Sequence, residues 1–282
     1  MTDFSKVAAI IPAGGCGQFK DNTKPKILEQ LTQWSSMISK VVGTVVDAGI
    51  YTICIVVNGN KFRMFRQGVR DDLDDNGIRV TSLDIRFAHQ HWRLGAAQAV
   101  ELGLGMLPPE IETVLVTYAD MPLWRPETLT GLIKRHFSSK AKISLVSVRL
   151  TDTTPATVRR YGRVLRDATG MIVGIIEPTD PLSVDIKSVT TVNPSLYVID
   201  RWWLDENLGD IPACDKGDGY PAEFHMPQLL QLAYKQKALV AELPLADHTE
   251  ALGANTLEEL VEVADILDER ESQEQVGSGL RP

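Results

Sequence analysis

The feature that most constrains the fold is an alternation of short apolar runs with helical stretches through the first half of the chain. The runs at 7–11, 52–57 and 113–118 are almost entirely apolar, as expected of strands that are buried on both faces. Between them, stretches such as 37–48 place apolar residues at helical spacing. Because right-handed crossovers join strands of this kind, the pattern predicts an α/β fold with a doubly wound, mostly parallel sheet.

The same alternation extends the prediction to about residue 150. Further helices are expected at 61–75, 94–107 and 126–137, and further strands at 82–88 and 143–150. Proline at position 126 suits the first turn of a helix, where the missing N–H has no intrahelical partner to lose. Residues 1–150 are therefore expected to supply the parallel part of the sheet.

Shorter elements of antiparallel character follow. Residues 167–170 (DATG) form a hairpin signal between two strand-like runs. The last helix is expected to begin with Thr256 as its N-cap and Glu259 completing a capping box. We expect one domain over 1–271 with an inserted antiparallel lobe at about 151–250, and a flexible tail at 272–282. The expected elements of this half are strands at 163–166, 171–176, 191–199 and 238–243 and helices at 226–237 and 256–271.

Composition narrows the class of protein. The 282 residues carry a formal net charge of −8, which argues against a general nucleic-acid-binding surface but not against a local anion pocket. No apolar run is long enough to span a bilayer, and the N-terminus lacks a secretory pattern. Cys16, Cys54 and Cys214 are scattered without zinc or disulfide spacing. We therefore expect reduced thiols and a cytoplasmic location, with no membrane or nucleic-acid partner.

A glycine-rich loop follows the first apolar run. Gly14, Gly15 and Gly17 allow close backbone approach to a ligand, and Lys26 could return to the same anion as a mobile charge. The loop is not a dinucleotide fingerprint, because Lys20 stands at its third glycine, and it lacks the Gly-Lys-Ser/Thr of nucleoside-triphosphatases. Two interpretations stay open: a phosphate-binding loop, or an ordinary strand-to-helix turn with surface lysines.

A second candidate is Asp120, which follows the apolar run at 113–118 directly. Ligands of parallel sheets bind outside the carboxyl ends of the strands, where both this carboxylate and the glycine loop are expected. A carboxylate beside bound phosphates suits Mg²⁺, which takes one or two protein oxygens plus phosphate oxygens. The alternative is an aspartate that only caps a turn or a helix.

Six segments in order resemble a known family. Residues 12–20 (PAGGCGQFK) with Pro25-Lys26 resemble the signature loop of the sugar-1-phosphate nucleotidyltransferases, and among these the uridyltransferases that use N-acetylglucosamine 1-phosphate. The resemblance covers nearly the whole chain, and we expect no counterpart of the acetyltransferase β-helix that accompanies the latter enzymes. The other matching segments are 93–99 (RLGAAQA), 118–123 (YADMPL), 161–164 (YGRV) with 174–177 (GIIE), 192–193 (VN) and 253–255 (GAN).

The resemblance implies that a sugar 1-phosphate attacks the α-phosphorus of a nucleoside triphosphate, with UTP as the expected triphosphate, and that pyrophosphate leaves. It implies Mg²⁺ as cofactor, a nucleotide-binding part at about 1–150 and a sugar-binding lobe at about 151–250; homo-oligomerisation stays open. The implied catalytic residues are Lys26, Lys20 and Asp120, and the implied metal ligands Asp120 and Asn255. The implied nucleotide-binding residues are Ala13, Gly14, Gly15, Gly17, Arg93, Gly95, Ala96 and Tyr118, and the implied sugar-binding residues Gly162, Glu177, Asn193 and His225.

Departures from the family pattern keep two alternatives open. Phe19 stands where the family has an arginine that contacts the triphosphate, and Lys20 is one position out of register for replacing it. The chain could therefore be an impaired relative that binds a nucleotide or sugar phosphate and regulates a partner. Arg93 stands where the family has a glutamine beside the base, and Pro194-Ser195 replace Thr-Gly. The same chemistry with CTP, GTP or an unusual sugar is the second alternative.

Overall fold

The computed structural model describes residues 3–14, 25–32, 35–58, 62–78, 83–177, 188–215 and 221–277. The strands from the first part of the chain pair in parallel, which confirms the predicted parallel core. Their spatial order is β3 (Asp84–Gln90), β2 (Thr52–Asn58), β1 (Val7–Pro12) and β4 (Thr113–Val116). All six residues of β1 are buried, because it lies between two strands and under helices on both faces.

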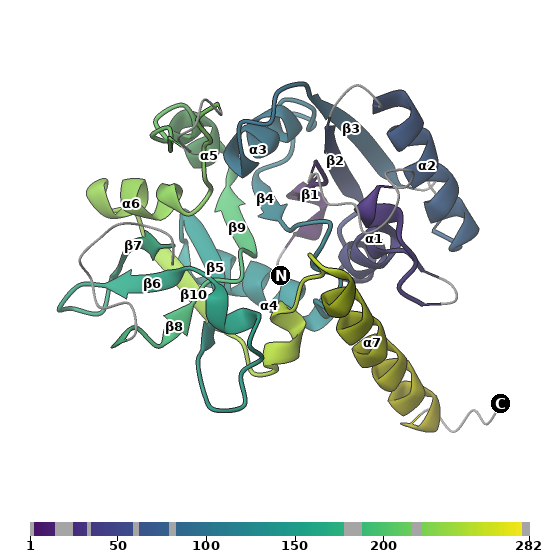
Figure 1. Ribbon diagram of the computed structural model, residues 1–282. Helices are drawn as coiled ribbons and strands as arrows, with labels where there is room; N and C mark the ends of the chain where they lie inside the picture. Colours follow the sequence, from purple (N-terminus) through teal and green to yellow (C-terminus); the bar gives the residue numbers. More distant parts are fainter. Residues whose placement is uncertain are drawn as a thin grey trace.

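The sheet continues past β4 with mostly antiparallel pairing, so it is mixed (Figure 1). Strand β9 (Tyr197–Asp200) lies antiparallel between β4 and β5 (Ile143–Arg149), and β10 (Val240–Pro244) pairs in parallel with β5. The predicted hairpin is confirmed as β6 (Arg163–Arg166) and β7 (Ile172–Ile176). Strand β8 (Thr191–Val192) joins this hairpin to β5.

Helices cover both faces of the sheet (Figure 1). Alternate residues of β1 explain this, because Val7, Ala9 and Ile11 join one core cluster whereas Ala8 and Ile10 join the other. One cluster receives side chains from α1 (Met37–Asp47), α2 (Phe62–Asp75), α4 (Pro126–Ser139) and α7 (Leu257–Gly277). The other receives side chains from α3 (Ala96–Leu104), α5 (Arg201–Leu208) and α6 (Gln228–Lys235).

Three predictions of elements need correction. The single strand expected at 191–199 is wrong, because Pro194 and the positive φ of 65° at Ser195 separate β8 from β9. Helix α5 was not predicted. Helix α7 continues to Gly277, six residues beyond its expected end and into the expected tail, and its C-terminal end projects away from the sheet (Figure 1).

The predicted capping box of α7 is confirmed. The Glu259 amide donates to Thr256 Oγ1 at 3.2 Å, and Glu259 Oε2 accepts from the Thr256 amide at 3.3 Å. Cys54 and Cys214 are free thiols, whereas Cys16 lies outside the described residues. Within the described ranges, none of the helices has the length and apolar character that crossing a membrane requires.

Candidate active site

Three side chains that are far apart in the sequence meet at one point. Lys26 Nζ donates to Asp120 Oδ2 at 3.1 Å and to Asn255 Oδ1 at 2.8 Å. Lys26 belongs to a short 3₁₀ helix, η2 (Lys26–Leu28), that Pro25 leads into, and its side chain is only 8% exposed. The predicted convergence of these three residues is therefore present in the structure.

The loops that carry Asp120 and Asn255 touch through their main chains. Asp120 comes shortly after β4, and its carbonyl oxygen accepts from the Ala254 amide at 3.0 Å. A Cβ atom on Gly253 would lie 2.9 Å from that same oxygen and 2.6 Å from Met121 Sδ, so only glycine fits there. The Asn255 amide in turn donates to Glu259 Oε2 at 2.7 Å, which fixes Asn255 at the start of α7.

The paired oxygens are a suitable donor set for Mg²⁺. Asp120 Oδ2 and Asn255 Oδ1 already converge on one cation, the Lys26 ammonium, and carboxylate and amide oxygens are ligands that Mg²⁺ accepts. Among the residues described here, no group of three or more His, Cys, Asp or Glu side chains could hold a metal ion. A magnesium ion at this pair would therefore need further oxygens from water or from bound phosphates.

The same point opens into a cavity of about 260 Å³. Its wall begins at the end of β1, where the glycine loop starts, and crosses to the segment before α3. Gly15, Gly17, Lys20 and Phe19 lie outside the described residues, so their predicted contacts stay predictions. The structure does bring eight of the predicted residues to this one cavity: Ala13, Gly14, Lys26, Arg93, Gly95, Ala96, Tyr118 and Asp120.

Gln90, at the end of β3, also lines the cavity and was missed by the sequence analysis. It is 5% exposed, and its Nε2 donates to Gly95 O at 3.0 Å and to Gln98 Oε1 at 2.9 Å. Two acceptors on one amide nitrogen fix the orientation of the side chain, which leaves Oε1 facing Gly14. Its closeness to the motif at 93–99 was the signal that could have found it.

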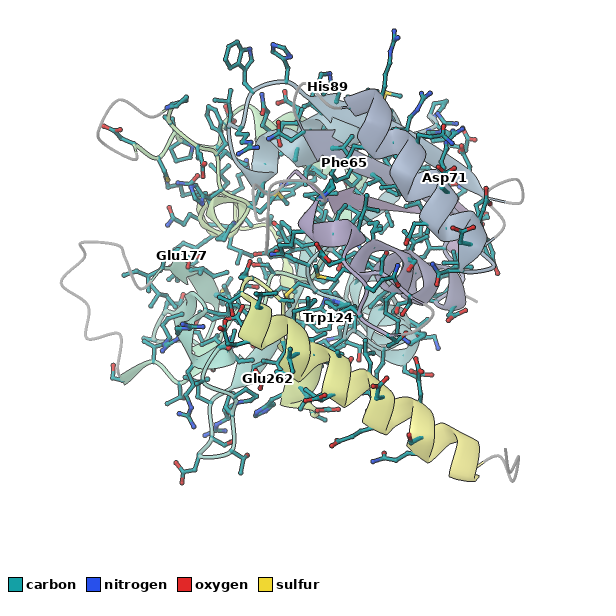
Figure 2. All side chains as sticks on the ribbon, turned by 45° about the vertical axis from the view of Figure 1, so that its right-hand side comes forward. Phe65, Asp71, His89, Trp124, Glu177 and Glu262 are labelled. Atoms are coloured by element: carbon teal, nitrogen blue, oxygen red, sulfur yellow. The ribbon has the colours of Figure 1, made fainter. Side chains whose placement is uncertain are left out.

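Three of the four predicted sugar-binding residues, Gly162, Glu177 and Asn193, form a separate cluster on the lobe of β6, β7 and β8. A Cβ atom on Gly162 would lie 2.8 Å from Glu177 Oε1, and the Asn193 amide donates to Gly162 O at 2.9 Å. Glu177 lies across the molecule from Asp71 of α2 (Figure 2). None of these three lines the cavity described above, but Glu177 acts electrostatically on Tyr118, which does.

Tyr118 joins the two parts of the site. Burial raises the pKa of Tyr118 well above its usual value, and Tyr197, Asp120 and Glu177 raise it further. Its phenol is therefore neutral at physiological pH and can both donate and accept a hydrogen bond. The two carboxylates that act on Tyr118 are Asp120, the predicted metal ligand, and Glu177, a predicted sugar ligand.

Asn193 and His225 take positions that differ from simple ligand contacts. Asn193 is 3% exposed, and its Nδ2 donates to Tyr197 Oη at 2.6 Å and contacts Ser195 Oγ at 3.3 Å. Its amide hydrogens therefore have internal partners, and the side chain supports the loop next to Gly162. His225 Nε2 lies 3.7 Å from Glu223 Oε2, and Glu223, not His225, lines the cavity.

Comparison with known proteins places this geometry in a family. The family model described as nucleotidyl transferase matches residues 9–220, which is most of the chain. The chain belongs to the nucleotidyl transferase family. As a nucleotidyl transferase it has the mixed α/β sheet and the cavity at the ends of the parallel strands described above.

Curated relatives of this nucleotidyl transferase include the bifunctional protein GlmU of several bacteria. The chain is 28% identical over 263 residues to GlmU of Geotalea daltonii, covering 93% of this chain and 53% of that protein. It is 29% identical over 274 residues to GlmU of Pelobacter propionicus, covering 97% and 55%. The chain thus spans about half the length of the curated relatives it matches.

Proposed function

We propose that this nucleotidyl transferase moves a nucleotidyl group from a nucleoside triphosphate to a sugar 1-phosphate in a reaction that requires Mg²⁺. The observation that carries the proposal is the meeting of Lys26, Asp120 and Asn255 at the edge of a cavity walled by the start of the glycine loop. Beside that loop, an ammonium can bind phosphate oxygens, and a carboxylate and an amide oxygen can ligate the cation that accompanies them.

The proposed chemistry is an in-line displacement at the α-phosphorus. An oxygen of the sugar phosphate forms the new P–O bond, the bond from the α-phosphorus to the bridging oxygen breaks, and pyrophosphate leaves with that electron pair. Lys26 neutralises negative charge on the reacting phosphates, and Asp120 and Asn255 hold Mg²⁺, which, when bound, supplies further charge neutralisation. Catalysis of this kind depends on positioning and electrostatics more than on proton transfer.

Gln90 favours UTP among the triphosphates. Because its Nε2 is committed to Gly95 O and Gln98 Oε1, the atom it offers the cavity is the acceptor Oε1. Uracil carries an N–H at position 3 that can donate to such an acceptor, whereas the same position of cytosine is an acceptor and would be repelled. We therefore propose UTP as the triphosphate and, from the resemblance of the six sequence segments to uridyltransferases that use N-acetylglucosamine 1-phosphate, an acetylated amino-sugar 1-phosphate as the second substrate.

Arg93 is the specific observation behind a second candidate. It is exposed at the rim of the same cavity and offers only donors, which match the acceptor edges of cytosine and guanine. Under this candidate the chemistry is unchanged and the base is read by Arg93 instead of Gln90. The binding-only alternative depends on Phe19, which lies outside the described residues.

The test is a reaction panel with pyrophosphate release and nucleotide-sugar formation as readouts. Four nucleoside triphosphates are each combined with N-acetylglucosamine 1-phosphate and other sugar 1-phosphates in the presence of Mg²⁺. We expect turnover with UTP, and a loss of at least about 100-fold in Asp120→Asn because the carboxylate that pairs with the cation is gone. Asp205→Asn, on the exposed face of α5, is the matched control and should keep full activity.

The panel also separates the candidates. A clear preference for CTP or GTP would show that Arg93, and not Gln90, recognises the base. Folded protein that is thermally stabilised by UTP and Mg²⁺ but produces no pyrophosphate with any pair would refute the catalytic proposal and support the binding-only alternative.

A further inference from the structure

Residues outside the cavity fasten together the two loops that carry Asp120 and Asn255. The first loop is 120–125, before α4, and the second is 247–255, which contains the 3₁₀ helix η6 (His248–Ala251). The Arg125 amide in the first loop donates to Glu250 Oε2 in the second at 2.9 Å, and Glu250 is 4% exposed. Breaking this contact is costly, because it would leave the Arg125 N–H without its acceptor and remove one donor from a buried carboxylate.

One side chain of α7 contacts both loops at once. Arg270 Nη1 donates to the carbonyl oxygen of Leu123 at 2.7 Å. Its Nη2 donates to Thr249 Oγ1 at 2.8 Å and to Asp247 Oδ2 at 3.3 Å. The guanidinium therefore links a point three residues after Asp120 to a point six residues before Asn255. The side chain of Arg270 is 14% exposed, so solvent screens these contacts little.

The geometry requires an arginine. Two nitrogens of one rigid plane donate in two directions, which an ammonium on a flexible stem does not reproduce. Burial lowers the pKa of Arg270, Arg125 lowers it further, and Asp247 and Glu250 oppose this. Holding a buried cation at this place costs free energy that the contacts to the two loops must offset.

Helix α7 thus acts on the site from two directions. Its first turn fixes Asn255 through Glu259, and its later turns bring Arg270 to the loop after Asp120. Trp124 of the first loop lies alongside α7 in Figure 2 and lines a small cavity together with Leu267 and Arg270. Side chains of this helix therefore contact both segments whose oxygens meet at Lys26.

We propose that Arg270 is a positioning residue, which holds the Asp120 and Asn255 loops at the separation that a bound divalent cation needs. The part of this proposal that concerns the cation rests on the proposed function. The part that concerns the loops does not, and each part has its own measurement.

The first measurement is amide hydrogen exchange of the whole chain. Arg270→Lys keeps the charge but loses the two-directional contact, so we expect faster exchange in peptides covering 119–125 and 249–255. Glu271→Gln is the matched control, because Glu271 is the next residue of α7 but pairs with Lys40 of α1 at 3.6 Å and not with either loop. Thr249→Ala, which removes one acceptor of Arg270, should give a smaller change of the same kind. Wild-type protection of both peptides in Arg270→Lys would overturn the proposal.

The second measurement is Mn²⁺ binding in the presence of UTP, followed by electron paramagnetic resonance. We expect Arg270→Lys to weaken Mn²⁺ binding about tenfold or more, as is typical when a supporting partner of a metal ligand is lost. Glu271→Gln should bind Mn²⁺ as the wild type does. Two results together would refute the proposal and reduce Arg270 to a structural role. The first is equal Mn²⁺ affinity in the wild type and Arg270→Lys, and the second is an equal loss of thermal stability in Arg270→Lys and Glu271→Gln. Absence of UTP-dependent Mn²⁺ binding in the wild type would refute the proposed function instead, and the exchange result would still decide whether Arg270 holds the loops.

Discussion

At the scale of single residues, the cluster of Gly162, Glu177 and Asn193 depends on a contact that leaves no room for a methyl group. Gly162 faces the side chains of Ile175 and Glu177, and a Cβ atom added there would lie 2.6 Å from Ile175 Cγ2 and 2.8 Å from Glu177 Oε1. Both distances are far below van der Waals contact. The position of the Glu177 carboxylate is therefore coupled to the absence of a side chain at position 162.

Gly162→Ala should destabilise the protein by about 1–3 kcal/mol, the usual cost of overpacking, and should displace Glu177. Urea unfolding measures the first effect. Gly209→Ala is the control, because nothing lies within 4 Å of its added Cβ atom and its φ of −67° suits alanine. Equal stability of the two variants would contradict the packing argument.

Single residues also show how far the sequence predicts the site. Lys26, Asp120 and Asn255 could be found because each lies in a short segment whose order along the chain resembles the family. Gln90 was missed although it lies close to the motif at 93–99, because it ends a strand and looks like any buried position of that strand; its orientation depends on two acceptors, Gly95 O and Gln98 Oε1, brought to it by the fold. Asn193 stays a predicted sugar ligand, and the sequence did not indicate that its Nδ2 donates to Tyr197 Oη and Ser195 Oγ.

At the scale of elements, the break between β8 and β9 has the clearest local cause. Ser195 adopts a φ of 65°, a conformation that costs a residue with a side chain about 1 kcal/mol. Its amide donates to Asn193 Oδ1 at 3.2 Å, and its hydroxyl lies 3.3 Å from Asn193 Nδ2. The strain is therefore accompanied by contacts that hold Asn193.

Two substitutions separate the strain from the hydroxyl. Ser195→Ala loses the hydroxyl and keeps the strained backbone, whereas Ser195→Gly loses the hydroxyl and relieves the strain. We expect the glycine variant to be more stable than the alanine variant by about 1 kcal/mol in chemical denaturation. The opposite order would show that the left-handed backbone at position 195 is not a source of strain.

Sequence patterns within a few residues predicted most helices and strands, but they missed those that depend on contacts between distant parts of the chain. The capping box of α7 and the hairpin of β6 and β7 were predicted because their signals lie within a few residues. Helix α5 was missed because its sequence, RWWLDENL, has no clear apolar stripe; it is held instead by Asp200 as N-cap, whose side chain accepts from the Trp203 amide at 2.8 Å. No periodicity indicates that β9 pairs antiparallel between β4 and β5.

At the scale of the whole molecule, a buried histidine should make stability depend on pH. His136 of α4 is 4% exposed, and its Nδ1 lies 2.9 Å from Ser144 Oγ of β5. Burial lowers the pKa of His136 from 6.5 to about 4, with Asp200 opposing and Lys142 adding to the shift. The unfolded state therefore binds a proton more readily than the folded state between these values.

The contribution of neutral His136 to the free energy of unfolding is complete above about pH 6.5 and decreases as the pH falls toward about 4. Between about pH 6.5 and pH 5 the loss should reach about 2 kcal/mol. Urea unfolding at several pH values measures it, and His136→Gln, which keeps a polar group near Ser144, should have a smaller slope. If the free energy of unfolding varied with pH in the same way in the wild type and in His136→Gln, His136 would be excluded as the cause of the pH dependence.

The meeting of Lys26 with Asn255 joins residues that are 229 positions apart, and Asp120, the other acceptor of Lys26, lies between them in the sequence. A ribosome must therefore have synthesised the chain as far as position 255 before the third member of this centre exists. Nascent chains that fold their first strands early still carry an unfinished centre, because its last oxygen arrives only with the segment that begins α7. A chain that ended between β10 and Asn255 would contain every described strand of the sheet and would lack the Asn255 oxygen of this centre.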